Sequence, residues 1–214
     1  MSLENELDNL GKESVVASQE IKSLSKHEKN ELLKAIIESL KNDKDLILKA
    51  NERDIEESQN KLSNAMIDRL MLDDQRFEGI LESIKNVISL DDPTGNILFT
   101  NERPNGMIVE RVSVPLGVIG IIYESRPNVT IDATVLCLKA GNSVILRGGS
   151  ECFNTNTAMV NSMQKAMRSK SVSENIVQYV NTTDRAAVDY MLSKMDKYID
   201  VIVPRGGKGL VKKV

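Results

Sequence analysis

The 214-residue sequence has no tryptophan, two cysteines and one histidine. Two cysteines are too few for a disulfide framework, and neither Cys137 nor Cys152 stands at a usual zinc-ligand spacing from His27. The side chains that most often hold a metal are therefore scarce and scattered. We predict that the protein uses no metal.

The sequence also lacks any run approaching the roughly 20 apolar residues that a membrane-spanning helix needs. Its N-terminus is acidic and amphipathic, whereas a signal peptide is basic and then apolar. There is no excess of positive charge, because 28 basic residues stand against 31 acidic ones, for a formal net charge of −3. These absences predict a cytoplasmic protein with no nucleic-acid or membrane partner, in which a local site must hold any anion.

The residues that are present suit a folded protein, since 41% are hydrophobic and 28% are charged. Residues 1–92 contain successive proline-free runs of apolar residues at helical spacing, which predict a helical arm that begins the cofactor-binding domain. Ser25 and Glu28 form a capping-box pattern, so a long helix is expected over residues 26–58. Shorter helices are expected over residues 64–72 and from residue 74 onward.

Residues 93–114 differ in character, because apolar and polar residues alternate on either side of the turn Pro104-Asn105-Gly106. This pattern predicts a β-hairpin over residues 96–114. One interpretation is a protruding hairpin whose exposed edges pair with another subunit, which would make a homo-oligomer. The alternative is a hairpin that packs on its own domain.

Residues 115–214 alternate short apolar runs with helical segments, a pattern typical of a parallel sheet covered on both faces. Strands are expected over residues 118–123, 143–146, 176–179 and 198–203, and helices over residues 129–140, 154–168 and 184–195. Right-handed crossovers give a Rossmann-like α/β fold, whose ligands bind beyond the carboxyl ends of the strands.

Three loops that follow these strands are rich in glycine and charged residues. They carry Glu124, Ser125, Arg126 and Asn128 after the first strand, Arg147, Gly148, Gly149 and Glu151 after the second, and Pro204, Arg205, Gly206 and Gly207 after the fourth. Paired glycines let a backbone approach a ligand closely, helix N-termini offer free N–H groups to phosphate, and arginines add forked donors. Neither a GxGxxG fingerprint nor a P-loop is present. Three such loops at one sheet edge nevertheless predict a nucleotide site.

Four segments carry a family resemblance. They read AMIDRL over residues 65–70, VPLGVIGIIYESRPNVT over residues 114–130, LCLKAGNSVILRGG over residues 136–149 and DKYIDVIVPRGG over residues 196–207. Their combination resembles gamma-glutamyl phosphate reductases, which belong to the aldehyde dehydrogenase superfamily. The likeness covers nearly the whole chain, and it implies an aldehyde dehydrogenase-like fold.

The resemblance implies a full-length enzyme that reduces glutamyl 5-phosphate to glutamate 5-semialdehyde with NADPH, a step of proline biosynthesis. In such an enzyme a cysteine thiolate attacks the acyl phosphate, phosphate leaves, and hydride from NADPH reduces the thioester. Asn128 matches the superfamily asparagine that donates to the thioester oxygen, with a turn or cap role as the alternative. The resemblance also leaves open an association with glutamate 5-kinase.

The same resemblance assigns residues to the cofactor and the substrate. Arg147 stands where the superfamily has a lysine that reaches the adenosine ribose, and an arginine there is expected to pair with the 2′-phosphate of NADP. Glu151 is expected at the ribose hydroxyls, and Gly206 and Gly207 at the pyrophosphate. The other cofactor assignments are Tyr123, Glu124, Gly148, Gly149, Pro204 and Arg205, whereas Ser125 and Arg126 are expected to face the phosphorylated substrate.

In the family the nucleophilic cysteine follows the PRGG segment, in a second domain. Because this chain stops at Val214, we expect residues 115–214 to be the NADPH-binding part of an inactive portion that lacks the catalytic cysteine domain. Cys137 has the surroundings of a buried inert thiol, and Cys152 has no obvious activating neighbour. The sequence leaves open whether the truncation is natural. The alternative function is a stand-alone nucleotide-binding or interaction module without catalysis.

Overall fold

The centre of the computed structural model, which describes residues 2–124 and 126–211, is a four-stranded parallel sheet. Its strands are β3 (Val118–Tyr123), β4 (Ser143–Arg147), β5 (Val177–Tyr179) and β6 (Val201–Arg205), in the spatial order β5-β4-β3-β6. The chain builds outward from β3 to β5 and then returns to β6 on the opposite side of β3. This arrangement confirms the predicted Rossmann-like α/β fold, and the strand order reverses between β3 and β6.

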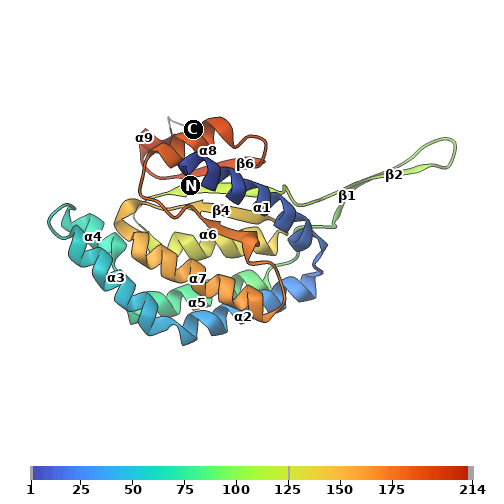
Figure 1. The fold of residues 1–214 in the computed structure, drawn as a ribbon. Coiled ribbons are helices and arrows are strands. Elements are labelled where there is room, and N and C mark those ends of the chain that lie inside the picture. Colours follow the sequence, from blue (N-terminus) through green and yellow to red (C-terminus); the bar gives the residue numbers. More distant parts are fainter. Residues whose placement is uncertain (1, 125, 212–214) are drawn as a thin grey trace.

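Alternate residues of each strand point to opposite faces of the sheet. Because all residues of β3 and β4 are buried, both faces of the sheet are covered, and helices cover them. Ile119 and Ile121 of β3 pack toward α6 (Pro127–Lys139) and α7 (Phe153–Ser169). Val118 and Ile122 pack on the other face, toward α1 (Leu3–Ser23) and α8 (Ala186–Lys194). Figure 1 shows the two helical layers with the sheet between them.

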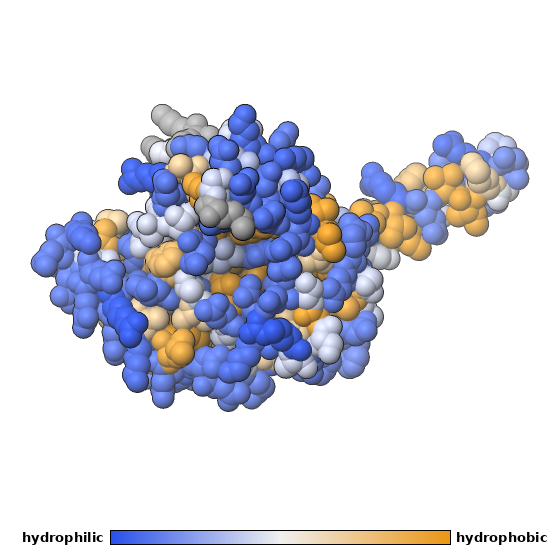
Figure 2. Space-filling model, viewed as in Figure 1, coloured by the Kyte–Doolittle hydropathy of each residue, from blue (hydrophilic) through white to orange (hydrophobic). Residues whose placement is uncertain are grey.

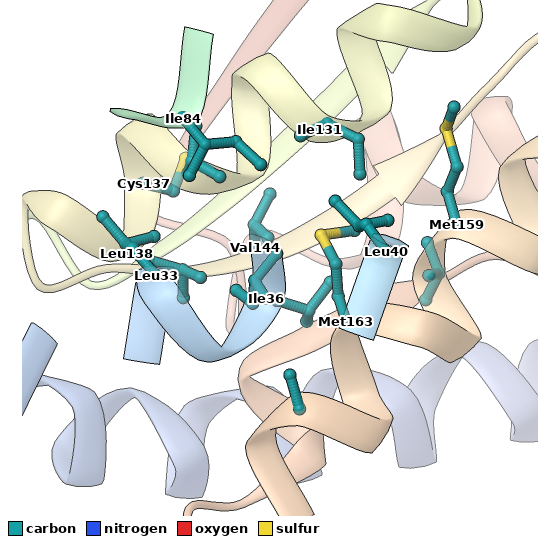
Figure 3. Close-up of a cluster of buried hydrophobic side chains, with 14 of the residues drawn as sticks. Leu33, Ile36, Leu40, Ile84, Ile131, Cys137, Leu138, Val144, Met159 and Met163 are labelled. Carbon is teal, nitrogen blue, oxygen red and sulfur yellow. The ribbon is translucent and has the colours of Figure 1, made fainter. Parts of the chain in front are cut away.

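A further layer of helices covers the outer side of α6 and α7 (Figure 1). It contains α2 (Lys26–Asn42), α3 (Lys44–Ser58), α4 (Asn64–Leu70) and α5 (Asp74–Ser89). Leu33 and Ile36 of α2 lie in one buried cluster with Leu138 and Met163, as Figure 3 shows. Burial of each such side chain contributes about 1.5–3 kcal/mol, so this layer stabilises the helices that cover the sheet.

The long helix predicted over residues 26–58 is wrong, because two helices, α2 and α3, meet at Asp43. The Asp43 backbone has φ −99° and ψ 10°, which interrupts the helical path. Asparagine and aspartate compete with the backbone for hydrogen bonds and favour such interruptions. The Asp43 carboxylate accepts from Lys165 Nζ at 2.9 Å, and both helices pack on α7.

Two other boundaries that matter for the site also differ from the prediction. Helix α6 begins at Pro127, two residues earlier than expected, so Asn128 lies in its first turn. Strand β6 begins at Val201 rather than residue 198, because the backbone N–H of Tyr198 donates to the Met195 carbonyl at 2.9 Å in a turn. The strand also ends later than predicted, at Arg205 rather than residue 203.

The predicted hairpin is confirmed as β1 (Ile97–Glu102) paired with β2 (Ile108–Val112). Gly106 has φ +82°, a conformation that the turn requires and that glycine adopts without strain. The hairpin projects from the body of the protein (Figure 1), and apolar side chains lie along it in Figure 2. Phe99 is 55% exposed and Ile108 is 64% exposed, so the body does not cover the hairpin.

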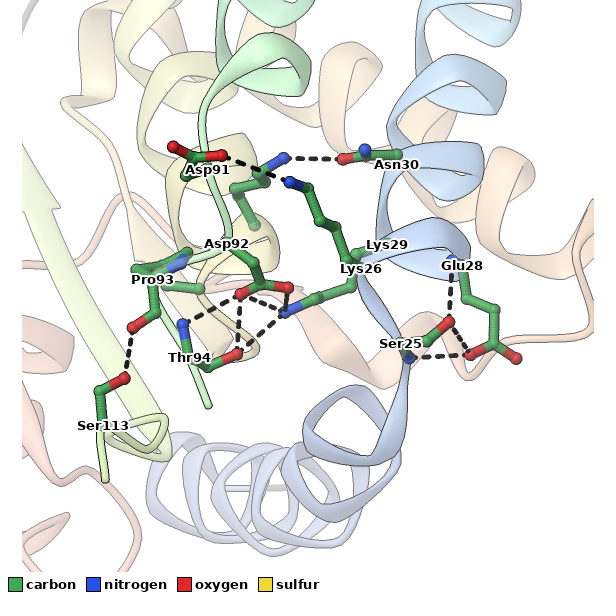
Figure 4. Close-up of polar contacts among 12 residues, drawn as sticks. Ser25, Lys26, Glu28, Lys29, Asn30, Asp91, Asp92, Pro93, Thr94 and Ser113 are labelled. Atoms are coloured by element: carbon green, nitrogen blue, oxygen red, sulfur yellow. Dashed lines mark hydrogen bonds and ion pairs between the residues drawn. The ribbon is translucent and has the colours of Figure 1, made fainter. Parts of the chain in front are cut away.

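The base of the hairpin is fixed to α2 by an ion pair between a buried lysine and a partly buried aspartate (Figure 4). Lys29 Nζ, on a residue that is 3% exposed, lies 2.7 Å from Asp92 Oδ2 and also donates to Thr94. Burial alone would raise the pKa of Asp92, but the hydrogen bonds from Lys29 and Thr94 outweigh it and lower the pKa.

In the part of the chain that the structure describes, no helix has the length and apolar content to cross a membrane.

Candidate active site

The carboxyl ends of β3 and β6 border a crevice at the point where the strand order reverses. The backbone N–H of Glu124 donates to the Arg205 carbonyl at 3.2 Å, which brings the two following loops together. A cavity of about 430 Å³ lies there, lined by Met66, Arg69, Glu124, Arg126, Arg205, Gly206 and Gly207. This is the place where open α/β sheets bind nucleotides.

The Glu124 side chain lies directly against the glycine loop that follows β6. Its Oε2 accepts a hydrogen bond of 2.8 Å from the backbone N–H of Gly207. A Cβ atom at Gly206 would lie 2.6 Å from the Glu124 Cδ, so only glycine fits there without displacement. A phosphate group that reaches the Gly207 N–H must therefore displace the Glu124 carboxylate.

Arg147 ends β4 and is 6% exposed. Its Nη2 donates to the carbonyls of Thr183 and Asp184 at 3.2 and 3.3 Å, and its Nη1 donates to the Gly148 carbonyl. The buried Nε has no hydrogen-bond partner among the described residues. Arg147 thus ties the end of β4 to the loop before α8 and keeps one donor unused.

The glycines and the glutamate after β4 lie beside Arg147. A Cβ atom at Gly148 would collide with the Asn156 side chain, and one at Gly149 would collide with the Glu151 carboxylate. Glu151 itself belongs to η1 (Ser150–Cys152), which leads into α7. The neighbouring side chains of Asn156 and Glu151 therefore leave no room for a side chain at Gly148 or Gly149.

Tyr123 is placed in the core rather than in the crevice. It is 2% exposed, and its hydroxyl lies 2.7 Å from Thr130 Oγ1. Burial raises the pKa of this phenol well above its ordinary value. Pro204, by contrast, lies within β6, one residue before the crevice.

A second cavity of about 380 Å³ adjoins the crevice on its helical side. It is lined by Asp68, Arg69, Met71, Leu72, Arg76, Gly79, Ile80, Ser83, Arg126, Pro127, Asn128 and Asp132. Asn128 Nδ2 donates to Asp132 Oδ2 at 2.9 Å, and Asp132 Oδ1 accepts from Ser83 Oγ at 2.8 Å. Ser125, which was assigned to the substrate, lies outside the described residues.

The predictions from sequence did not include the residues that α4 and α5 contribute to the cleft. Arg69 lines both cavities, and Arg76 lines the second. Arg76 Nη2 bonds Asp68 Oδ1 at 2.7 Å, and its Nη1 donates to the Met71 carbonyl at 2.8 Å. The only sequence signal for Arg69 was its place in the AMIDRL segment.

Both cysteines are buried thiols. Cys137 is 7% exposed and Cys152 is 0% exposed, and burial raises the pKa of each to about 12. Cys152 Sγ lies 3.2 Å from Asn156 Nδ2, which is too weak a donor to offset that burial. Neither thiol has the thiolate character that a nucleophile needs.

Within residues 2–124 and 126–211, no three histidine, cysteine or acidic side chains are grouped so that they could hold a metal ion.

Comparison with known proteins defines the class of this chain. The aldehyde dehydrogenase family matches residues 3–214, and the chain belongs to that family. Within it, the chain is 46% identical to the gamma-glutamyl phosphate reductase of Carboxydothermus hydrogenoformans over 211 residues, which are 98% of this chain and 51% of that protein. This similarity confirms the resemblance found in the sequence.

Solved structures agree with this assignment. The crystal structure of gamma-glutamyl phosphate reductase from Thermotoga maritima matches with a TM-score of 0.94 at 37% identity, over 97% of this chain and 50% of that one. An engineered glycolyl-CoA reductase with bound NADP+ shares the fold, with a TM-score of 0.69 at 20% identity over 97% of this chain and 44% of that one. The chain therefore spans about half the length of the relatives that it matches.

Proposed function

We propose that the full-length protein reduces L-glutamyl 5-phosphate to L-glutamate 5-semialdehyde and phosphate with NADPH in the cytoplasm. These 214 residues are its cofactor-binding portion. The observation that carries the proposal is the crevice between β3 and β6, lined by Glu124, Arg205 and the glycine pair, in a chain 46% identical to a gamma-glutamyl phosphate reductase. The reaction belongs to proline biosynthesis.

The residues around the crevice fit a dinucleotide. Gly206 and Gly207 have no side chains to block a pyrophosphate, and Arg205 supplies positive charge beside them. When bound, the nicotinamide supplies the hydride. Arg147 is proposed to select NADP over NAD through the 2′-phosphate, because it stands where the superfamily has the lysine that reaches the adenosine ribose. Glu151, in the same loop, is proposed to hold the ribose hydroxyls.

Asn128 is proposed to donate to the substrate oxygen that becomes negatively charged during the reaction. Its amide nitrogen carries two hydrogens, and the bond to Asp132 uses one of them. The other hydrogen serves the substrate in the second cavity, which Asn128 lines. Arg126 lines the same cavity and is proposed to face the phosphorylated end of the substrate.

The exposed hairpin supports a homo-oligomer as the working form. Apolar side chains such as Phe99 and Ile108 are more than half exposed on it, and a second copy would bury them. Association with glutamate 5-kinase stays a prediction from the family resemblance.

Two measurements on the 214-residue chain test the proposed function. One is calorimetric titration with NADPH, and the other is an assay of phosphate-dependent oxidation of glutamate 5-semialdehyde. We expect binding without turnover, because the buried Cys137 and Cys152 thiols are unsuited to attack. Absence of NADPH binding would contradict the cofactor assignment, and turnover would contradict the assignment of both cysteines as inert.

A further inference from the structure

The crevice and the second cavity have two lining residues in common, and both are arginines. Arg69 comes from α4, and Arg126 comes from the loop between β3 and α6. We propose that Arg69 and Arg126 together form the binding site for the phosphoryl group of the acyl phosphate substrate. This inference rests on the proposed function and adds the residues that hold the leaving group.

The charges of the cleft favour a doubly charged anion at this position. Asp68 is paired with Arg76, with 2.7 Å between Oδ1 and Nη2, whereas the described donors to Glu124 and Asp132 are neutral. Four arginines therefore stand against three carboxylates in the linings of the two cavities. Among the described residues, no hydrogen bond or ion pair holds the guanidinium of Arg69 or of Arg126. Both side chains are exposed to the cleft, and they create local positive charge in a chain whose formal net charge is −3.

The backbone that carries Arg69 is fixed in place. Leu70 is 0% exposed, and its carbonyl accepts from the buried Asn51 Nδ2 at 2.9 Å. Asn51 Oδ1 also accepts from the Leu72 N–H at 2.7 Å, which anchors the chain after α4. Arg69 is thus presented from a rigid support while its guanidinium stays unengaged by the described residues.

The backbone of Arg126 is fixed by a different device. Pro127 occupies the first turn of α6, and a residue before proline is restricted to extended conformations. Arg126 has φ −146° and ψ 99°, and its carbonyl accepts from the Val129 N–H at 3.1 Å. Its side chain therefore starts from a fixed point at the end of β3.

The position between the two cavities suits the leaving phosphate. In the proposed reaction a cysteine thiolate from the part of the full-length enzyme outside these 214 residues attacks the acyl carbon at this border, and the C–O bond to phosphate breaks as the C–S bond forms. The electron pair of that C–O bond ends on the phosphate oxygen, so negative charge grows there. Two guanidinium forks match phosphate oxygens in geometry and stabilise this charge.

The test is a titration of the 214-residue chain with inorganic phosphate. Calorimetry measures the affinity, and the NMR signals of the arginine Nε–H groups report which arginines bind the phosphate. We expect Arg69→Gln and Arg126→Gln each to weaken phosphate binding roughly tenfold or more. Arg53→Gln is the matched control, because Arg53 is exposed on α3 and lines neither cavity. It should bind phosphate like the wild type. Failure of the wild type to bind phosphate, or equal binding by all variants, would overturn the proposal.

A second arm distinguishes the substrate phosphate from the phosphates of the cofactor. Phosphate should still bind when the chain is saturated with NADPH, and the two arginine variants should retain NADPH affinity. Mutual exclusion of phosphate and NADPH would assign the arginines to the cofactor and overturn the inference. In that case the proposed function stands, because NADPH still binds, whereas loss of all NADPH binding would reject the proposed function itself.

Discussion

The carboxylate of Glu124 accepts a 2.8 Å hydrogen bond from the backbone N–H of Gly207, and this bond spans the crevice between β3 and β6. It links the loop after the first strand of the sheet to the loop after the last. The same N–H is the donor that the sequence assigns to the cofactor pyrophosphate. Under the proposed cofactor assignment, the Glu124 carboxylate occupies the place of a phosphate anion.

Removing the negative charge of Glu124 should increase the affinity of the chain for the cofactor. Glu124→Gln keeps an oxygen acceptor for the Gly207 N–H but removes the repulsion that the phosphates meet. We expect NADPH affinity to rise roughly two- to tenfold by calorimetry. Glu57→Gln, an exposed charge on α3, is the control and should leave the affinity unchanged. An unchanged or weaker affinity for Glu124→Gln would show that the carboxylate does not compete with the cofactor.

Arg147→Ala should weaken NADPH more than NADH, by roughly tenfold, because it removes a guanidinium assigned to the 2′-phosphate. Parallel titrations with the two cofactors measure this difference. The substitution also leaves the carbonyls of Thr183 and Asp184 without their donor, so thermal unfolding should confirm that the variant is folded. Equal losses for both cofactors would remove Arg147 from the 2′-phosphate role.

The exposed hairpin should control self-association. We expect the wild-type chain to self-associate in sedimentation velocity, and Phe99→Glu, which places a charge among the apolar residues of β1, should leave it monomeric. Thr100→Glu is the control, because it adds the same charge at the adjacent position, which points to the opposite face of the strand. NADPH binding should be the same in both. A wild-type chain that stays monomeric at high concentration would contradict the assignment.

The two thiols should be inert in the folded chain. Burial raises the pKa of Cys137 and Cys152 from an ordinary value of 9.0 to about 12, so both are protonated near neutral pH. A thiol reagent should react slowly with the native chain and rapidly after unfolding in urea. Since the folded pKa values are raised, their contribution to stability is complete below pH 9.0 and is lost as the pH rises toward 12. Rapid labelling of the native chain would contradict this account.

The Lys29–Asp92 pair should matter far more than its exposed neighbour. Lys29→Met removes the cationic partner of a partly buried carboxylate, which still accepts from Thr94, and should lower the free energy of unfolding by about 1.5–3 kcal/mol. Lys26→Met breaks the exposed pair with Asp91 and should cost about 0–1 kcal/mol. Urea unfolding measures both.

Acid provides an independent check on this ion pair. The pKa of Asp92 is lowered in the folded protein, so its contribution is present above the unfolded pKa and is lost as the pH falls through the folded value. The difference between wild type and Lys29→Met should therefore shrink in acid. A difference that does not change with pH would place the effect in packing rather than in charge.

The strands of the sheet could be predicted because local pattern decides them, whereas their spatial order comes from the structure. Residues 118–123 form β3 over the predicted range, because a strand of a parallel sheet that is covered on both faces reads as a short continuous apolar run. The break at Asp43 could not be predicted from periodicity, because apolar spacing continues across it. Packing of α2 and α3 on α7 determines where the helix bends.

Sequence reasoning predicted the residues of the candidate site that directly follow a strand. It missed the residues that only tertiary packing brings to the site. Arg205, Gly206 and Gly207 stand at the end of a strand, and the carboxyl ends of parallel strands share one edge of the sheet. Arg69 lies more than fifty residues before the loop that follows β3. It belongs to a helix that does not directly precede or follow a strand of the sheet. Only the fold brings it to Arg126, so its role could not follow from a motif.

The central claim is that the crevice between β3 and β6 binds NADPH. The most direct test maps the backbone amide signals of the isotope-labelled chain during titration with NADPH. The account predicts that the shifts concentrate in residues 123–128, 147–151 and 204–209, at the carboxyl edge of the sheet. Shifts that are absent, or that fall on the hairpin or the opposite edge of the sheet, would contradict it.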